Sequence, residues 1–215
     1  MSDAPEIVAA SGALAARFAA LVPGLVRATG PVSYDYQFGT PPGLFDAFIR
    51  AAWSAPDTLF SHSVARVALD GGELAGLEIG FDGPEFYRLR DALASISARL
   101  VASGQITRDE LRAVAVRSAK ASYLNAHIPR RVYYVHALSV PERQRGRGFG
   151  ARLLENALER ARRAGHRALQ LDVLADNPAV RFYESMGLGV LAETRSPELS
   201  REHGFPSELR MEIAF

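Results

Sequence analysis

Three glycines and three arginines are concentrated in one short loop, residues 141–150, between an apolar run and an amphipathic run. Glycine has no Cβ, so a glycine-rich loop can bring its backbone N–H groups close to a ligand. A helix that begins at such a loop adds unpaired N–H groups and the positive end of its dipole. Arg143, Arg145 and Arg147 place further positive charge beside this concavity of amides. These residue types, in this order, predict a binding site for a diphosphate.

Two well-known phosphate loops can be compared with this one. A Walker loop continues with Lys and then Ser or Thr, where this chain has Ala151-Arg152, so that class is excluded. The run Gly146-Arg-Gly148-Phe-Gly150-Ala151 does fit the GxGxxA pattern of dinucleotide-binding loops, and Asp172 follows at a suitable distance. A NAD(P)-dependent oxidoreductase therefore stays open as an alternative. So does a helix start whose arginines are merely solvated.

A second segment, residues 171–188, reads Leu-Asp-Val-Leu-Ala-Asp-Asn-Pro-Ala-Val-Arg-Phe-Tyr-Glu-Ser-Met-Gly-Leu. This segment and the loop spacing Arg145-x-x-Gly148-x-Gly150 resemble the two coenzyme-A-contacting segments of the GNAT family of N-acetyltransferases, in the family's order and at its separation. The resemblance covers residues 133–195, the expected acetyl-CoA-binding core. It implies an α/β fold with a mixed, mostly antiparallel central sheet and a parallel βαβ unit at the acetyl-CoA site. It also implies an acyltransferase that moves an acetyl group from acetyl-CoA directly to a primary amine of a small molecule or peptide, without a covalent acyl-enzyme.

The resemblance implies a role for each part of this core in holding acetyl-CoA as co-substrate. Backbone N–H groups at residues 138–140 would polarise the thioester carbonyl and meet the pantetheine amides, because the next strand splays away from them. The glycine-rich loop would bind the pyrophosphate, and the asparagine of the second segment would bind the pantetheine arm or only cap its helix. The residues expected to bind the coenzyme are Leu138, Ser139, Val140, Arg145, Gly146, Arg147, Gly148, Phe149, Gly150, Ala151 and Asn177.

Two proton-transfer roles also follow from the resemblance. Tyr183 stands where the family commonly has a tyrosine near the coenzyme A sulfur, so its hydroxyl is expected to protonate the leaving thiolate. His136 matches a histidine that serves the arylalkylamine N-acetyltransferases as proton acceptor, and the usual histidine pKa near ~6.5 suits a base at neutral pH. Glu78, Asp172 or a chain of water molecules are the alternative bases. Packing alone is the alternative role for both predicted residues.

Strand alternation predicts how the histidine is oriented. In a regular strand, His136 would share one face with Tyr134, Leu138 and Val140. On this interpretation the base would lie on the same side of the sheet as the side chains of the thioester-binding residues.

Composition limits the class of protein. With 215 residues, 48% of them hydrophobic, the chain is expected to form one domain over residues 1–215. The net charge of +1 provides no bulk attraction to nucleic acid or a membrane. Cysteine is absent, which excludes a cysteine acyl-enzyme and thiolate metal sites, and no metal is expected. Without a long apolar run or a signal pattern, a cytoplasmic location is expected.

Periodicity predicts the elements that position these residues. A short first strand at residues 6–10 precedes a helix that starts after Ser11 and ends at Pro23-Gly24. The turn sequence Asp70-Gly-Gly-Glu73 predicts a hairpin. Further elements are a helix over residues 151–164, a short helix capped by Asn177 and Pro178, and strands at 64–69, 74–81, 133–140, 168–174, 188–194 and 209–215.

Residues 84–128 interrupt the strand series with a helical hairpin. An apolar stripe from Phe86 to Leu100 predicts one helix, and the capping box Thr107-x-x-Glu110 opens a second. Because the corresponding strands of the family usually connect directly, the hairpin is expected to be an insertion. It would act as a substrate lid, or as a packing elaboration or homodimer surface. The aromatic residues between 34 and 53 would line an acceptor pocket or fill the core. A non-catalytic acyl-CoA sensor is a further functional alternative, and the acceptor amine is not determined.

Overall fold

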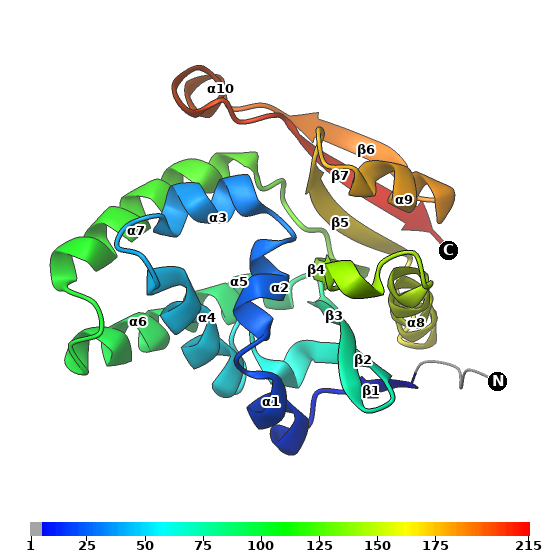
Figure 1. The fold of residues 1–215 in the computed structure, drawn as a ribbon. Helices are drawn as coiled ribbons and strands as arrows, with labels where there is room; N and C mark the ends of the chain where they lie inside the picture. The colour runs from blue at the N-terminus through cyan, green and yellow to red at the C-terminus, as the bar shows by residue number, and fades with distance from the viewer. Residues whose placement is uncertain (1–5) are drawn as a thin grey trace.

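A computed structural model describes residues 6–215, and Figure 1 shows how they are arranged. Seven strands form one sheet in the order β1-β2-β3-β4-β5-β7-β6. All neighbouring strands run antiparallel except β4 and β5, which are parallel. This confirms the predicted fold class. The strands are β1 (Glu6–Ala9), β2 (Ala65–Asp70), β3 (Glu73–Asp82), β4 (Val132–Ser139), β5 (Ala168–Leu174), β6 (Gly189–Thr194) and β7 (Glu208–Ala214).

Helices α1–α7 gather on one side of the strands, and α8 and α9 lie on the other (Figure 1). The α-helices are α1 (Gly12–Phe18), α2 (Val22–Arg27), α3 (Pro31–Phe38), α4 (Leu44–Ser54), α5 (Glu85–Asp91), α6 (Leu93–Ala102), α7 (Arg108–Ala121), α8 (Phe149–Arg163), α9 (Ala179–Ser185) and α10 (Pro197–His203). Three single-turn 3₁₀ helices join them: η1 (His62–Val64), η2 (Ser122–Leu124) and η3 (Glu142–Gln144). Within residues 6–215, no helix is long and apolar enough to cross a membrane.

The two faces of the sheet have separate hydrophobic cores. The buried stripe of α8, including Leu154, Leu158 and Ala161, covers one face together with α9. The larger core fills the other face between β2–β4 and the N-terminal helices. The hairpin at residues 84–128 contributes fully buried side chains to this core, Leu89 and Ile96 among them. The hairpin is therefore packed into the core of the domain, and its predicted role as a lid or a homodimer surface stays a prediction.

A bulge in β4 gives the His136 side chain a different orientation from the predicted one. Ile79 of β3 pairs with Ala137 and the next residue, Gly80, pairs with Val135, so His136 is an extra residue on β4. One extra residue reverses the alternation of side chains beyond it. Leu138 therefore packs against the α8 side, whereas His136 lies on the opposite side, next to Phe81. The prediction that His136 shares a face with Leu138 and Val140 is wrong.

The parallel pair opens toward its carboxyl ends. Pairing between β4 and β5 stops at Val135 and Leu171, although β4 continues to Ser139 and β5 to Leu174. Residues 136–139 therefore have a strand neighbour only on the β3 side, and their other backbone edge is free of the ladder. This is the splayed arrangement expected from the sequence.

Two helix predictions differ from the structure. The first helix ends at Phe18, and Pro23 lies in the first turn of α2, where a missing N–H removes no helical hydrogen bond. The stripe from Phe86 to Leu100 divides into α5 and α6 at Ala92. There the N–H and the hydroxyl of Ser95 both donate to the Ala92 carbonyl, which tightens the turn. The capping box of Thr107 and Glu110 is confirmed.

Helices α3 and α10 were not predicted, because neither has a clear apolar stripe. The ring of Tyr36 in α3 contacts the rings of His203 and Phe205, at the end of α10 and just beyond it, in tilted and edge-to-face arrangements. Leu199 of α10 is buried in the same small cluster with Leu124. Contacts between distant segments stabilise these two helices.

Candidate active site

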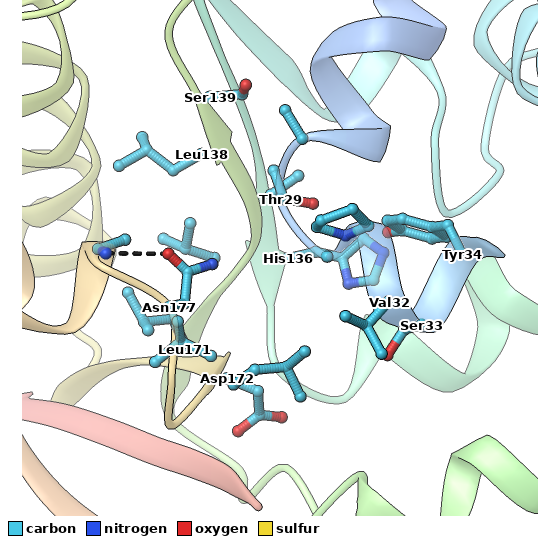
Figure 2. A pocket seen from close by; sticks show the side chains of 18 of the residues that line it. Thr29, Val32, Ser33, Tyr34, His136, Leu138, Ser139, Leu171, Asp172 and Asn177 are labelled. Carbon is cyan, nitrogen blue, oxygen red and sulfur yellow. Dashed lines mark hydrogen bonds between the residues drawn. The ribbon is translucent and has the colours of Figure 1, made fainter. Parts of the chain in front are cut away.

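One large cavity, with a volume of about 1310 Å³, connects the predicted donor residues with the N-terminal helices. It begins at the glycine-rich loop, follows the opening between β4 and β5, and ends among α3, α4 and α5–α7. Figure 2 shows Leu138 and Asn177 on one side of β4, and His136 and Tyr34 on the other. The sheet opening thus joins two compartments, which we call the donor side and the acceptor side.

The loop between β4 and α8 presents its backbone to the donor side. Gly146 and Gly148 have φ angles of 75° and 84°, which glycine adopts without strain. The first hydrogen bond of α8 runs from Arg152 N–H to Gly148 O, so the N–H groups of residues 149–151 have no helical acceptor. A Cβ on Gly148 would meet no atom within 4 Å, so the space beside it is open. This arrangement fits a diphosphate.

The arginines of this loop point in different directions. Arg145 lines the cavity, and its Nε–H donates to the Val140 carbonyl at 3.3 Å. Arg147 instead forms an ion pair with Asp70 at 2.7 Å and lies over the Phe149 ring. To bind a diphosphate, Arg147 would have to leave Asp70. Since both side chains of this pair are partly exposed, that exchange costs little free energy.

The remaining donor-side residues line the same cavity. Leu138, Ser139 and Val140 do so along the free edge of β4, and residues 148–151 do so at the start of α8. The side-chain Oδ1 of Asn177 accepts a hydrogen bond from Ala179 N–H at 2.9 Å, which leaves the side-chain NH₂ group for a ligand (Figure 2). The helix is assigned from Ala179, one residue later than predicted, but Asn177 provides the predicted capping bond.

Tyr183 of α9 lines the cavity and is buried in the core below α8. Burial raises the pKa of Tyr183 to about 12. Its hydroxyl therefore keeps its proton at neutral pH and can donate it, or a hydrogen bond, to a group in the cavity. This is the protonation state that the predicted role requires.

His136 lines the acceptor side, with the rings of Phe60 and Phe86 centred 5.2 and 6.0 Å away. Its Nε2 is buried and has no hydrogen-bond partner among residues 6–215. Burial lowers the pKa of His136 to about 4. The imidazole is therefore neutral at pH 7, and it is a weaker base than a histidine in water.

The two alternative carboxylate bases lie in different places. Glu78 is fully buried on the α8 side, where it pairs with Arg160 at 2.6 Å and accepts from the Tyr133 hydroxyl at 2.9 Å. It does not line the cavity. Asp172 does line the cavity, but its two oxygens are occupied by Arg210 and by the Tyr134 hydroxyl.

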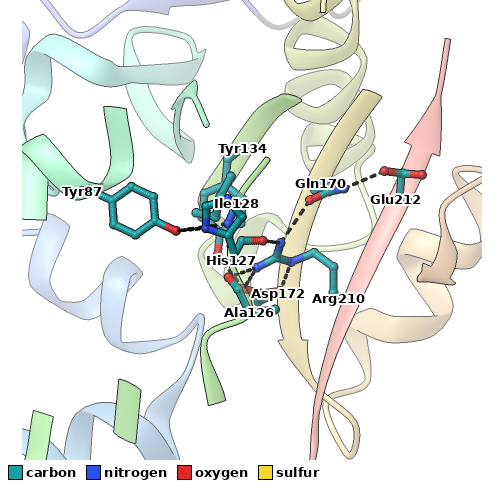
Figure 3. Close-up of polar contacts among 9 residues, drawn as sticks. All are labelled: Tyr87, Ala126, His127, Ile128, Tyr134, Gln170, Asp172, Arg210 and Glu212. Carbon is teal, nitrogen blue, oxygen red and sulfur yellow. Dashed lines mark hydrogen bonds and ion pairs between the residues drawn. The ribbon is translucent and has the colours of Figure 1, made fainter. Parts of the chain in front are cut away.

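Arg210 of β7 is the centre of a buried network (Figure 3). Its Nε and Nη2 donate to the two oxygens of Asp172. The other N–H groups donate to Gln170 Oε1 at 3.1 Å and to the carbonyls of Ala126 and His127 at 2.8 and 3.1 Å. All five N–H groups are thus used. The network fastens the segment that enters β4 to β5 and β7, beside the acceptor side.

Glu208, which is not among the predicted site residues, also lines the acceptor side. Burial and the charge of Asp172 raise the pKa of Glu208 to about 7, although Arg210 opposes the shift. In the sequence, the one feature that pointed to Glu208 was its position on the polar face of the last strand. The apolar residues that line the acceptor side include Phe38, Phe48, Phe60, Phe86, Leu111 and Val114. Within residues 6–215, no cluster of three His, Asp or Glu side chains could hold a metal ion.

The fold also decides against the dinucleotide alternative. A dinucleotide-binding loop belongs to an open, mostly parallel sheet with crossover helices. Here one pair of strands is parallel and the rest are antiparallel. The GxGxxA match therefore lies in a sheet that does not have the topology of a dinucleotide-binding fold.

Solved structures of other proteins share this mixed, mostly antiparallel fold. Solved structures of similar fold include an N-acetyltransferase from Staphylococcus aureus Mu50 (TM-score 0.72, 15% identity, covering 97% of this chain and 100% of that one). Another, described as an acetyltransferase, has a TM-score of 0.69 and 19% identity over 97% and 98% of the two chains. The polyamine N-acetyltransferase of Drosophila melanogaster, which forms N-acetylagmatine, has a TM-score of 0.58 and 17% identity over 99% and 100%. At these identities, the structural similarity shows that this chain has the same fold as those proteins.

Sequence comparison provides the family. No curated protein matches the chain. A model of the Acetyltransferase (GNAT) family matches residues 41–188, well over half of the chain. The matched segment includes the glycine-rich loop, the opening between β4 and β5, and Tyr183. The chain therefore belongs to the Acetyltransferase (GNAT) family and is an acyltransferase of the N-acetyltransferase kind.

Proposed function

We propose that this protein transfers the acetyl group of acetyl-CoA directly to the primary amine of a small molecule with an apolar body. The main support is the cavity that runs from the glycine-rich loop through the sheet opening to the acceptor side. A donor bound on one side and an acceptor bound on the other would meet at that opening. Direct transfer within a ternary complex needs no enzyme nucleophile, in keeping with the lack of cysteine.

The donor side supports acetyl-CoA by its backbone. The free amides at the start of α8 suit the pyrophosphate, with Arg145 beside them. The free edge of residues 136–139 offers N–H and C=O groups to the amides of a pantetheine arm. Tyr183 and Asn177 border the same opening, with a proton and an amide NH₂ group to donate.

The acceptor side supports a small apolar amine. Its walls include aromatic and aliphatic side chains from α3, α4, α5 and α7, and the polar side chains of Gln37, Arg90 and Ser118 also line it. We propose that the hairpin at residues 84–128 shapes this compartment, since Phe86, Leu111 and Val114 line it. Burying a phenyl or alkyl group there would stabilise the complex by about 25 cal/mol per Å². Whether the hairpin also forms a homodimer surface stays a prediction.

A two-part assay tests the proposal. Calorimetric titration of the protein with coenzyme A should show saturable binding. Thiol release from acetyl-CoA should then occur with phenethylamine, more efficiently than with agmatine or a short peptide, and mass spectrometry should identify the acetylated amine. Binding of coenzyme A without thiol release from any amine would instead identify an acyl-CoA sensor. Absence of coenzyme A binding would refute the donor assignment.

A further inference from the structure

Glu208 is a carboxylate without a cation at the edge of the acceptor side. It is the first residue of β7, opposite Leu174 of β5 and Thr194 of β6. It is half-buried and lines the cavity. Within residues 6–215 its carboxylate has no hydrogen-bond or ion-pair partner, although the charge of Arg210 acts on it through space. Such a carboxylate is costly to bury unless a ligand completes it.

The register of β7 explains why this acid is left alone. Glu208, Arg210 and Glu212 project from the same face of the strand. Arg210 lies opposite Asp172 and pairs with it. Glu212 lies opposite Gln170 and accepts a hydrogen bond from it at 2.6 Å (Figure 3). The residue opposite Glu208 is Leu174, which has no polar side chain to offer.

The groups that face Glu208 leave a local negative charge. They are Asp172 on β5, Arg210 on β7, Tyr134 on β4 and Tyr34 on α3. Arg210 balances Asp172, and burial keeps both tyrosines neutral because it raises their pKa values. An ionised Glu208 is then the uncompensated charge. An ammonium group on an otherwise apolar ligand would complement it.

We propose that Glu208 receives the ammonium group of the acceptor amine and takes one proton from it, so that the free amine can attack the thioester. This inference rests on the proposed function. The amine nitrogen then forms the C–N bond while the C–S bond breaks. The second proton of the nitrogen passes to the Tyr183 oxygen as the Tyr183 hydroxyl protonates the departing sulfur. Glu208 returns its proton to solvent, and one proton is released overall.

The comparison with His136 favours Glu208 as the proton acceptor. The pKa of Glu208 is raised to about 7, whereas burial lowers that of His136 to about 4. Since each pH unit is a factor of ten, Glu208 holds a proton about 10³-fold more strongly than His136. A base with a pKa near the working pH is the better catalyst. His136 is then a neutral wall of the acceptor side.

Glu208→Gln tests this role, because the substitution keeps the shape and removes the charge. With phenethylamine and acetyl-CoA, kcat/KM should fall by about 10²-fold or more, and the limb of the pH profile near pH 7 should disappear. Glu208→Asp should retain that limb at reduced activity. Glu212→Gln, the same change on the same strand outside the cavity, should behave like the unmodified protein. Coenzyme A affinity, measured by calorimetry, should be equal in all four proteins.

Two results separate this inference from the proposed function. If the unmodified protein acetylates phenethylamine and Glu208→Gln keeps its kcat/KM and pH limb, Glu208 has no role and the proposed function stands. If no amine is acetylated, the proposed function fails. In that case, calorimetric binding of phenethylamine to the coenzyme A complex still tests whether Glu208 binds the ammonium group. Equal affinity for Glu208→Gln and the unmodified protein would overturn its role as the ammonium site.

Discussion

Replacing Glu208 by glutamine is expected to stabilise the folded protein, by an amount that increases with pH. In the unfolded chain this carboxyl loses its proton near pH 4.5, whereas in the folded protein it keeps the proton to about pH 7. Between these values the folded state binds more protons, so ionisation of Glu208 lowers stability as pH rises. Below about pH 4.5 this cost is absent, and above about pH 7 it is complete. Glutamine does not titrate, so the Glu208→Gln protein does not have this cost of ionisation.

The magnitude follows from the two pKa values. Each pH unit between them corresponds to about 1.36 kcal/mol, so the cost above pH 7 is at most about 3 kcal/mol. Water in the cavity reduces it, because the side chain is only half-buried. For a protein of this size, about 1–3 kcal/mol corresponds to a rise in Tm of roughly 2–12 °C. A functional residue that lowers stability is a common trade-off.

Urea unfolding at about pH 5 and about pH 8 measures the effect. The difference in unfolding free energy between Glu208→Gln and the unmodified protein should be small at the lower pH and larger at the higher one. Glu212→Gln should show no such dependence, since Glu212 keeps its partner Gln170. A Glu208→Gln protein that is less stable at pH 8, or shifted equally at both pH values, would contradict the burial of an unpaired carboxylate.

Three further substitutions test the other parts of the site. Tyr183→Phe should reduce kcat by about 10²–10⁴-fold with little change in Tm or coenzyme A affinity, and acyl donors with better leaving groups should recover much of the loss. Gly148→Val should abolish coenzyme A binding in calorimetry. Gly165→Val, which places valine at a similar φ of 75° at the other end of α8, should cost similar stability and leave binding intact. Arg210→Met should lower the free energy of unfolding by about 3–5 kcal/mol in urea titrations, because Asp172 is left buried without its partner, and adding Asp172→Asn should restore part of it.

Local signals in the sequence were sufficient for much of the fold. The capping box at Thr107, the hairpin turn at Gly71 and Gly72, and the apolar stripe of α8 each depend on residues within a few positions of one another. The same holds for the glycine-rich loop, whose positive φ angles and helix start follow from its own residue types. These features form as predicted because the local preference of each segment agrees with the fold that surrounds it.

The orientation of His136 could not be obtained in this way. The bulge in β4 arises from its pairing with β3, where a side chain on Gly80 would collide with Tyr133 and Glu78. Alternation along one strand predicts a side only while the pairing stays regular. One unpaired residue therefore separated His136 from Leu138 and Val140, with no sign in the local sequence.

Glu208 shows the same division most clearly. The alternating sequence of the last strand indicates that Glu208, Arg210 and Glu212 share a face. The tertiary structure determines which of these residues has a partner. The register with β5 places Arg210 at Asp172 and leaves Glu208 beside Leu174, and α3, far away in the sequence, brings Tyr34 to the same cavity. Residue types and spacing thus indicate the family and predict the donor site, whereas burial and charge balance at the acceptor side depend on contacts between segments that only the folded chain brings together.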